Sequence, residues 1–199
     1  MKSGLFATLC ATVLWFTSPA VATAEQIDTS TISCETLHNA FESKTSENIS
    51  FVNGILNWMG GYHATSDQGT VVDWAKLSAA FDQTVEYCGE HPGIGVKSAS
   101  EKFMGENIED PGTDGVDLAI ITCEAVLTNK DLSKNIGDTF MWLAGYHASY
   151  NNGSTMLDIE KFIKQTSSIA DYCGANPKVG LVTASEKFMD ESEGEGEAQ

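Results

Sequence analysis

The hexapeptide ASEKFM occurs twice in this chain of 199 residues, at residues 99–104 and again at residues 184–189. Other short segments recur at nearly the same interval, GYH at 61–63 and 145–147 and YCG at 87–89 and 172–174. Self-similarity at a fixed interval is the signature of a duplicated unit. The sequence therefore predicts a tandem repeat, in which the two halves must adopt the same fold.

Each repeat contains one pair of cysteines, Cys34 with Cys88 and Cys123 with Cys173. An even number of cysteines, one pair per repeat, predicts two disulfides in an oxidising compartment. Four cysteines allow three pairings. The repeat favours Cys34–Cys88 and Cys123–Cys173, because each unit then closes itself.

A zinc site is the alternative use of these cysteines. In the first repeat a histidine follows each cysteine by three or four residues (His38 and His91), as in a Cys2His2 site. The second repeat keeps both cysteines but has Leu127 and Asn176 in place of the histidines. A role common to both repeats needs only the cysteines, so we favour disulfides and expect no bound metal and no cofactor.

The N-terminal residues have the pattern of a secretory signal peptide. Lys2 is followed by an apolar run over residues 5–16, and the motif ATA at residues 22–24 supplies a cleavage site. The apolar run is too short to span a bilayer comfortably. We therefore predict that residues 1–24 are a signal peptide, cut after Ala24, and that the protein is exported to the periplasm.

The remaining chain divides into two repeats, a linker and a tail. The first repeat is expected at residues 25–104 and the second at residues 116–189. Residues 105–115 (GENIEDPGTDG) are acidic and contain Pro and Gly, a composition typical of an interdomain linker. Residues 190–199 are acidic and lack large apolar side chains, so we expect a disordered tail.

Apolar residues recur with helical spacing in both repeats. One predicted helical face comprises Phe51, Ile55, Trp58, Met59 and Tyr62. Asp73 and Asp158 precede further apolar stretches of helical period and are predicted N-caps. Pro92 and Pro177 are each predicted to occupy the first position of a final helix. The pattern predicts an all-α fold of two tandem small helical domains, with about four helices and one disulfide in each.

The chain is strongly acidic, with 28 Asp and Glu residues against 11 Lys and no Arg, and its formal net charge is −17 at pH 7. Such a surface repels nucleic acid and anionic membranes, so we expect neither as a partner. Near pH 2 the carboxylates are neutral while Lys and His are charged, and the net charge becomes roughly +15. This reversal removes carboxylate pairing and adds self-repulsion, so a small core can loosen in acid while disulfides still constrain the chain.

Each repeat has a Cys-Glu pair, then W-x-x-G-Y, a loop with a hydrophobic-Asp pair, then YC-x-x-[HN]-P and a final short helix. This order of motifs resembles the HdeA/HdeB family of periplasmic acid-stress chaperones. The resemblance covers residues 34–104 and 123–189, and its most specific segments are YCGEHP and YCGANP. It implies an all-helical domain with one disulfide. It also implies neutral-pH dimers that open at very low pH and bind unfolding proteins through exposed apolar surface.

We therefore predict a periplasmic acid-stress chaperone whose partners are unfolded or acid-destabilised periplasmic proteins. The two repeats could form an intrachain pseudo-dimer, or the chain could form a homodimer. The predicted client-binding residues are apolar residues of two equivalent helices, Phe51, Ile55, Trp58, Phe140 and Trp142. The alternative function is a periplasmic interaction module, such as an immunity protein, that binds one specific partner independently of pH.

An enzymatic interpretation would rest on polar residues shared by both repeats, namely His63/His147, Asp73/Asp158 and Glu101/Glu186. Histidine with carboxylates can form an acid–base site. The simpler interpretation is that the aspartates cap helices and the glutamates face solvent. His63 and His147 either complement a helix dipole or respond to pH. We expect no catalytic residue and no enzyme activity.

Overall fold

The computed structural model describes residues 26–64, 69–105, 115–130, 135–151 and 153–190. Each half contains four α-helices within this part of the chain, which confirms the predicted all-α tandem fold. The first half has α1 (Cys34–Ser43), α2 (Ser46–Tyr62), α3 (Trp74–Glu90) and α4 (Val96–Ser100), and the second has α5 (Cys123–Thr128), α7 (Ile136–Asn151), α8 (Ile159–Ala175) and α9 (Leu181–Met189). The predicted signal peptide, residues 106–114 of the predicted linker and residues 191–199 of the predicted tail lie outside the described residues.

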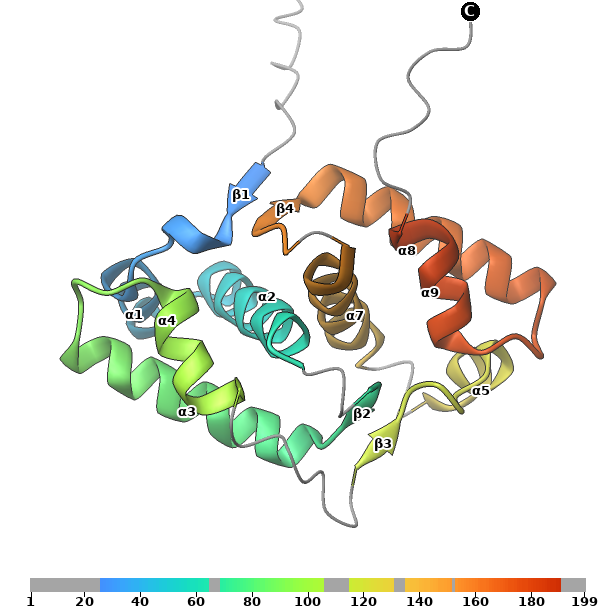
Figure 1. Ribbon diagram of the computed structural model, residues 1–199, viewed down its shortest axis with the longest axis horizontal. Coiled ribbons are helices and arrows are strands. Elements are labelled where there is room, and N and C mark those ends of the chain that lie inside the picture. Colours follow the sequence, from blue (N-terminus) through green and yellow to red (C-terminus); the bar gives the residue numbers. More distant parts are fainter. Residues whose placement is uncertain (1–25, 65–68, 106–114, 131–134, 152, 191–199) are drawn as a thin grey trace, which may run out of the picture.

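The two halves meet through α2 and α7, which lie side by side at the centre of the molecule (Figure 1). Helices α1, α3 and α4 surround α2 on one side, and α5, α8 and α9 surround α7 on the other. A π-helical turn, η2 (Glu101–Gly105), continues α4, whereas α9 is α-helical throughout. The apolar residues of both halves form one continuous core cluster.

Asp73 and Asp158 are N-caps, as the sequence predicted. The Oδ1 atom of Asp73 accepts hydrogen bonds from the backbone N–H groups of Ala75 and Lys76, both at 3.0 Å. Asp158 accepts one from the N–H of Lys161 at 2.8 Å. These bonds satisfy N–H groups at the starts of α3 and α8 that have no partner inside their own helix.

Pro92 and Pro177 do not start helices, and that prediction is wrong. Helix α4 begins at Val96 and α9 at Leu181. The two prolines lie in the turns before these helices, and their carbonyl groups accept hydrogen bonds from the backbone N–H of Glu35 (3.2 Å) and Glu124 (2.8 Å). Each proline turn therefore caps the first helix of its own half, because the first N–H groups of that helix need acceptors from outside it.

Both predicted disulfides are present, Cys34–Cys88 and Cys123–Cys173. Each joins the start of the first helix in its half to the end of the third helix. All four cysteines are buried, none being more than 2% exposed. The disulfides also exclude the Cys2His2 alternative, because they consume the thiolates that zinc would need.

Four short strands connect the halves, and sequence analysis did not predict them. Strand β1 (Gln26–Asp28) pairs antiparallel with β4 (Met156–Asp158), and β2 (Val71–Val72) pairs antiparallel with β3 (Val116–Asp117). Each pair joins the first segment of one half to the middle of the other half (Figure 1). Strands of two or three residues are too short to produce a recognisable alternating pattern.

Removing either disulfide is expected to destabilise its half strongly. Replacing both Cys34 and Cys88 by Ala releases a loop of 54 residues, and the equivalent change at Cys123 and Cys173 releases one of 50. By the chain-entropy relation each loss is about 4 kcal/mol in the free energy of unfolding. Urea unfolding of the two double variants at pH 7 measures it. Near-wild-type stability in either variant would contradict this role for that disulfide.

Candidate functional site

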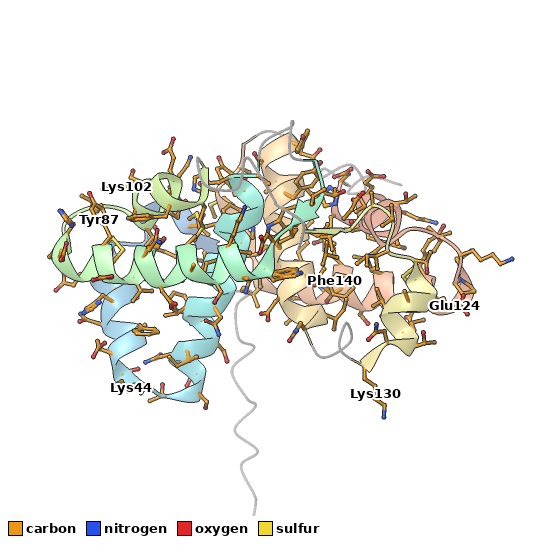
Figure 2. The ribbon with its side chains drawn as sticks, turned by 90° about the horizontal axis from the view of Figure 1, so that it is seen from below. Lys44, Tyr87, Lys102, Glu124, Lys130 and Phe140 are labelled. Atoms are coloured by element: carbon orange, nitrogen blue, oxygen red, sulfur yellow. A yellow bond between two sulfur atoms is a disulfide. The ribbon has the colours of Figure 1, made fainter. Side chains whose placement is uncertain are left out.

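The predicted client-binding residues lie at or beside the contact between α2 and α7. Four of the five are almost completely buried: Ile55, Trp58, Phe140 and Trp142 are between 1% and 8% exposed. Phe51 is partly buried and packs against the same core. Phe140 is seen between the two halves in Figure 2. The apolar faces predicted from helical spacing are thus covered in this structure, and they cover one another across the two repeats.

Two glycines allow α2 and α7 to approach this closely. A Cβ atom at Gly61 would collide with the backbone carbonyl of Trp142, and a Cβ atom at Gly145 would collide with that of Trp58. The two collisions are reciprocal, so the helices are related by an approximate two-fold axis. The glycine of each GYH motif is therefore required by contact with the other repeat. Within one chain, the two repeats pack against each other through α2 and α7.

Aromatic and polar contacts reinforce this arrangement. Trp58 stacks on Tyr62 with ring centroids 5.0 Å apart, and Trp142 stacks on Tyr146 at 5.4 Å. Across the contact, the Tyr62 hydroxyl donates to the carbonyl of Gly153 at 2.9 Å. These interactions orient the aromatic rings that fill the space between the halves.

One polar interaction between α2 and α7 is partly buried. The side-chain amide of Asn57, itself 4% exposed, donates to Asp138 at 3.1 Å. Burial raises the pKa of Asp138. The folded state therefore favours the protonated form of this carboxyl group, and acid relieves the cost of burying its charge.

The strand pairs carry a second reciprocal contact. Asp28 accepts hydrogen bonds from the Ser30 hydroxyl (2.6 Å) and, across the halves, from the Thr155 hydroxyl (2.8 Å). In the other pair, Asp117 accepts one from the Thr70 hydroxyl at 3.0 Å. The hydrogen bonds from Ser30 and then Thr155 lower the pKa of Asp28. Its charged form is therefore favoured by folding, the opposite of Asp138.

The repeated motifs meet one another within each half. Lys102 and Phe103 of the first ASEKFM segment contact Tyr87 of the YCG motif, the Lys102 ammonium lying 4.2 Å from the ring centroid (Figure 2). Lys187 lies over Tyr172 in the same way, at 4.3 Å. The recurrence of these motifs thus reflects one packing arrangement used twice.

The two predicted pH-responsive histidines occupy equivalent positions, His63 as the C-cap residue of α2 and His147 within α7. His63 Nε2 lies 3.0 Å from Ser100 Oγ, and His147 Nε2 lies 2.9 Å from Ser185 Oγ. His147 Nδ1 also pairs with Asp190 at 2.8 Å. Burial lowers the pKa of both imidazoles, and Asp190 opposes this effect at His147.

The contacts among Ser185, His147 and Asp190 have the connectivity of a hydrolase triad. The serine, however, is completely buried, and its hydroxyl lies within hydrogen-bond distance of the Val182 carbonyl at 2.7 Å. A nucleophile must reach its substrate, and this serine has no exposed surface from which to do so. The arrangement therefore serves packing between α7 and α9 in this structure.

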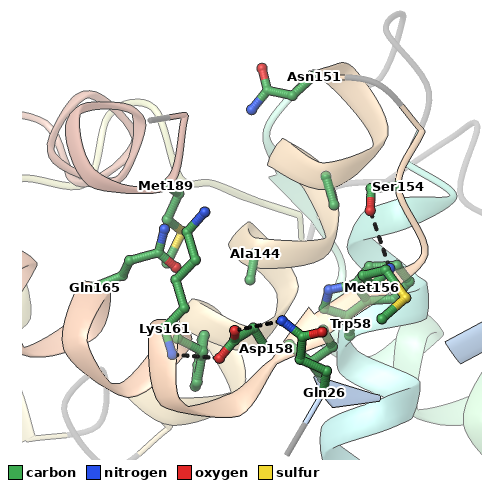
Figure 3. A pocket seen from close by; sticks show the side chains of 13 residues that line it. Gln26, Trp58, Ala144, Asn151, Ser154, Met156, Asp158, Lys161, Gln165 and Met189 are labelled. Carbon is green, nitrogen blue, oxygen red and sulfur yellow. Dashed lines mark hydrogen bonds between the residues drawn. The ribbon is translucent and has the colours of Figure 1, made fainter. Parts of the chain in front are cut away.

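A cavity of about 480 Å³ opens at the contact between the halves, beside α7 and α8 (Figure 3). Its apolar lining includes Trp58, Phe162 and Met189, and its polar lining includes Gln26 and Lys161. Sequence analysis did not predict it. Trp58, which belongs to the first half, thus lines a cavity whose other lining residues come mostly from the second half.

In the first half, residues equivalent to part of this lining pack closely. Gly60 stands where the second half has Ala144, and Leu77 Cδ1 lies only 2.7 Å from where a Cβ atom at Gly60 would be. Ala80 takes the place of Gln165, and Leu77 and Ala80 are both buried. The two repeats thus differ in the side chains at these positions.

Alanine at Gly61 or at Gly145 is expected to force α2 and α7 apart. Each new methyl group would meet a backbone carbonyl, and overpacking of this kind costs about 1–3 kcal/mol or more. Gly54→Ala, also in α2, is the matched control, because its Cβ would meet only Met141 Cε at 3.8 Å. Urea unfolding at pH 7 should show the control unchanged or slightly stabilised by helix propensity. Equal stability of all three variants would refute the proposed role of the two glycines.

Asp28→Asn is expected to reduce the dependence of stability on acid. The pKa of Asp28 is lower in the folded protein than in the unfolded chain, where it is about 3.9. The charged carboxylate therefore contributes to the free energy of unfolding above that unfolded pKa, and the contribution is lost as pH falls through the folded pKa. The variant should therefore be less stable than wild type at pH 7, and the difference should shrink towards pH 2. Urea midpoints at both pH values test this, with exposed Asp171→Asn as the control. A constant difference at both pH values would count against it.

None of the helices within the described residues has both the length and the apolar composition of a bilayer-spanning helix. Searches of curated proteins and of solved structures return no match to this chain. The model of the HdeA/HdeB family matches it twice, over residues 5–98 and 103–183. The family is one of periplasmic acid-stress chaperones. The two matches coincide with the two halves of the fold, and the chain belongs to the HdeA/HdeB family as a tandem duplication.

Proposed function

We propose that this protein is a periplasmic chaperone that separates its two halves in acid and holds unfolding proteins on the apolar surface so exposed. The observation that carries the proposal is the burial of Ile55, Trp58, Phe140 and Trp142 where α2 meets α7. This surface is covered in the structure and becomes available only when the halves move apart. Family membership supports the same class of function.

Acid weakens the contact between the halves at β1 and β4. Protonation of Asp28 removes the charge that holds the hydroxyls of Ser30 and Thr155 beside β1 and β4. The change of net charge from −17 to roughly +15 adds repulsion throughout the chain. Neutralisation of Asp138 acts in the opposite direction, so the opening depends on the balance of all these groups.

The disulfides limit how far acid can unfold each half. The S–S bond between the first and third helices of a half does not depend on pH, so those helices stay tethered when other contacts weaken. A half whose packing loosens while its disulfide is intact can expose apolar side chains and still be partly folded. Unfolding client proteins, which expose apolar surface in the same acid, are the partners that such a surface fits.

A second candidate function is supported by the exposed apolar side chains. Within the described residues, the large ones all lie in the second half, and they include Ile120 (77% exposed), Leu127 (51%) and Ile163 (60%). The equivalent residues of the first half are Thr31, His38 and Ser78. Apolar residues exposed at neutral pH favour a partner that binds without acid. Such a protein would be an interaction module for one specific partner.

The decisive experiment follows the aggregation of an acid-labile protein by light scattering. The purified mature chain should suppress aggregation at pH 2–3 and have no effect on a heat-destabilised protein at pH 7. The physical reason is that the α2–α7 surface is accessible only in acid. Absence of suppression at pH 2–3 would refute the proposed chaperone function. Suppression at both pH values would show that client binding does not require the halves to open in acid.

Variants locate the surface in the same assay. Trp58→Ser should lower acid protection several-fold, and Phe51→Ser should lower it at less cost to folding, because Phe51 is only partly buried. Ile163→Ser is the matched control, since this side chain is already exposed at pH 7. Circular dichroism at pH 7 establishes that each variant folds. Full protection by a folded Trp58 or Phe51 variant would remove that residue from the client-binding surface.

A further inference from the structure

The two equivalent histidines differ in one respect, which is the group facing Nδ1. His147 Nδ1 lies 2.8 Å from the carboxylate of Asp190, which also accepts a hydrogen bond from Asn151 Nδ2 at 2.9 Å. The residue of the first half that corresponds to Asp190 is Gly105. Within the described residues, no carboxylate contacts the Nδ1 atom of His63. The second half thus has a buried histidine with a carboxylate partner, and the first half has a partly buried histidine without one.

The second half can accept a charged imidazole with both N–H groups satisfied. Ser185 Oγ lies 2.9 Å from His147 Nε2 and 2.7 Å from the carbonyl of Val182. When the imidazole is neutral and its proton is on Nδ1, the hydroxyl donates to Nε2. When the imidazole is charged, the hydroxyl turns to Val182 and accepts the Nε2 proton. Asp190 accepts the Nδ1 proton in both states.

Ser100 offers the same choice to His63, because its hydroxyl lies 2.9 Å from the carbonyl of Lys97. The charged groups that act on His63 are Glu101, which favours the imidazolium, and Lys97, which disfavours it. Those that act on His147 are Asp190 and Glu186, and both favour the imidazolium. All of them come from the last helix of the respective half or from the residues that directly follow it, so this segment determines how each histidine responds to acid.

We propose that acid loosens the two halves in sequence, the first when His63 becomes charged and the second only when the carboxylate of Asp190 is itself neutralised. In the second half, the pair of His147 and Asp190 holds the end of α9 against α7 after the histidine has gained its proton. In the first half, Gly105 supplies no carboxylate at this position, and the charge of His63 is favoured by Glu101 and opposed by Lys97. This inference concerns protonation and local opening, and it does not depend on chaperone activity.

The sign of the effect follows from burial. Because burial lowers the pKa of His63, the unfolded chain binds that proton first. The first half therefore begins to lose stability as pH falls below about 6.5, the pKa of an unfolded histidine. The loss is complete once pH is below the pKa of His63 in the folded protein. At His147 the same burial is opposed by Asp190, so the loss in this range is smaller.

Titration of both imidazoles by ¹⁵N NMR on the mature chain tests the proposal directly. His147 should titrate at a higher pH than His63, by about one pH unit or more, because an opposite charge in contact shifts a titration by roughly that amount. Asp190→Asn keeps an acceptor but removes the charge, and it should bring the midpoint of His147 down towards that of His63. Equal midpoints in wild type, or an unmoved His147 midpoint in Asp190→Asn, would overturn the proposal.

The first half supplies the reciprocal variant. Gly105→Asp places a carboxylate at the position equivalent to Asp190 and should raise the titration midpoint of His63. Amide hydrogen exchange, expressed as protection factors between pH 6 and pH 4, then reports the order of opening. In the wild type, the amides of α4 should lose protection from exchange at a higher pH than those of α9. Gly105→Asp should reduce the difference between these two pH values. Loss of protection in α9 first would overturn the sequence of opening, whatever the aggregation assay shows.

Discussion

The contact of α2 with α7 at Gly61 and Gly145 is the constraint on which the rest of the structure depends. Without a side chain at either position, each helix backbone rests on a tryptophan carbonyl of the other. That approach encloses Trp58 and Trp142 and brings the first segment of each half within reach of the middle of the other. A unit of this size buries only a modest core alone. The second repeat supplies the surface that completes the core of the first.

The two repeats share the residues that form the contact between α2 and α7, and they differ in residues on the other sides of these helices. Both retain the glycine, the stacked Trp–Tyr pair and the His–Ser contact. Behind α7, however, Ala144 and Gln165 line a cavity at the positions that Gly60 and Ala80 occupy in the first half, and Asp190 takes the place of Gly105. Within the described residues, the large exposed apolar side chains all lie in the second half. The duplication provides a symmetric interface between two unequal partners.

Placing both halves on one chain changes how acid can act on their contact. An intramolecular contact does not depend on protein concentration, so dilution cannot separate the halves. The groups at the contact respond to protonation in opposite directions: Asp28 favours its charged form in the folded state, and Asp138 favours its neutral form. The disulfides persist throughout. What acid can change is the packing between helices, while the covalent frame of each half remains.

The sequence by itself determined the duplication, the disulfide pairing, the apolar helix faces and the caps at Asp73 and Asp158. These features depend on repeated motifs or on residues a few positions apart, so their physical causes are local. Only the tertiary structure decided what covers the helix faces, which strands pair across the halves, and why the proline turns cap a distant helix. It also decided the pairing of His147 with Asp190. Those contacts join residues far apart in the chain, and no local periodicity encodes which distant segment comes to lie beside a given one.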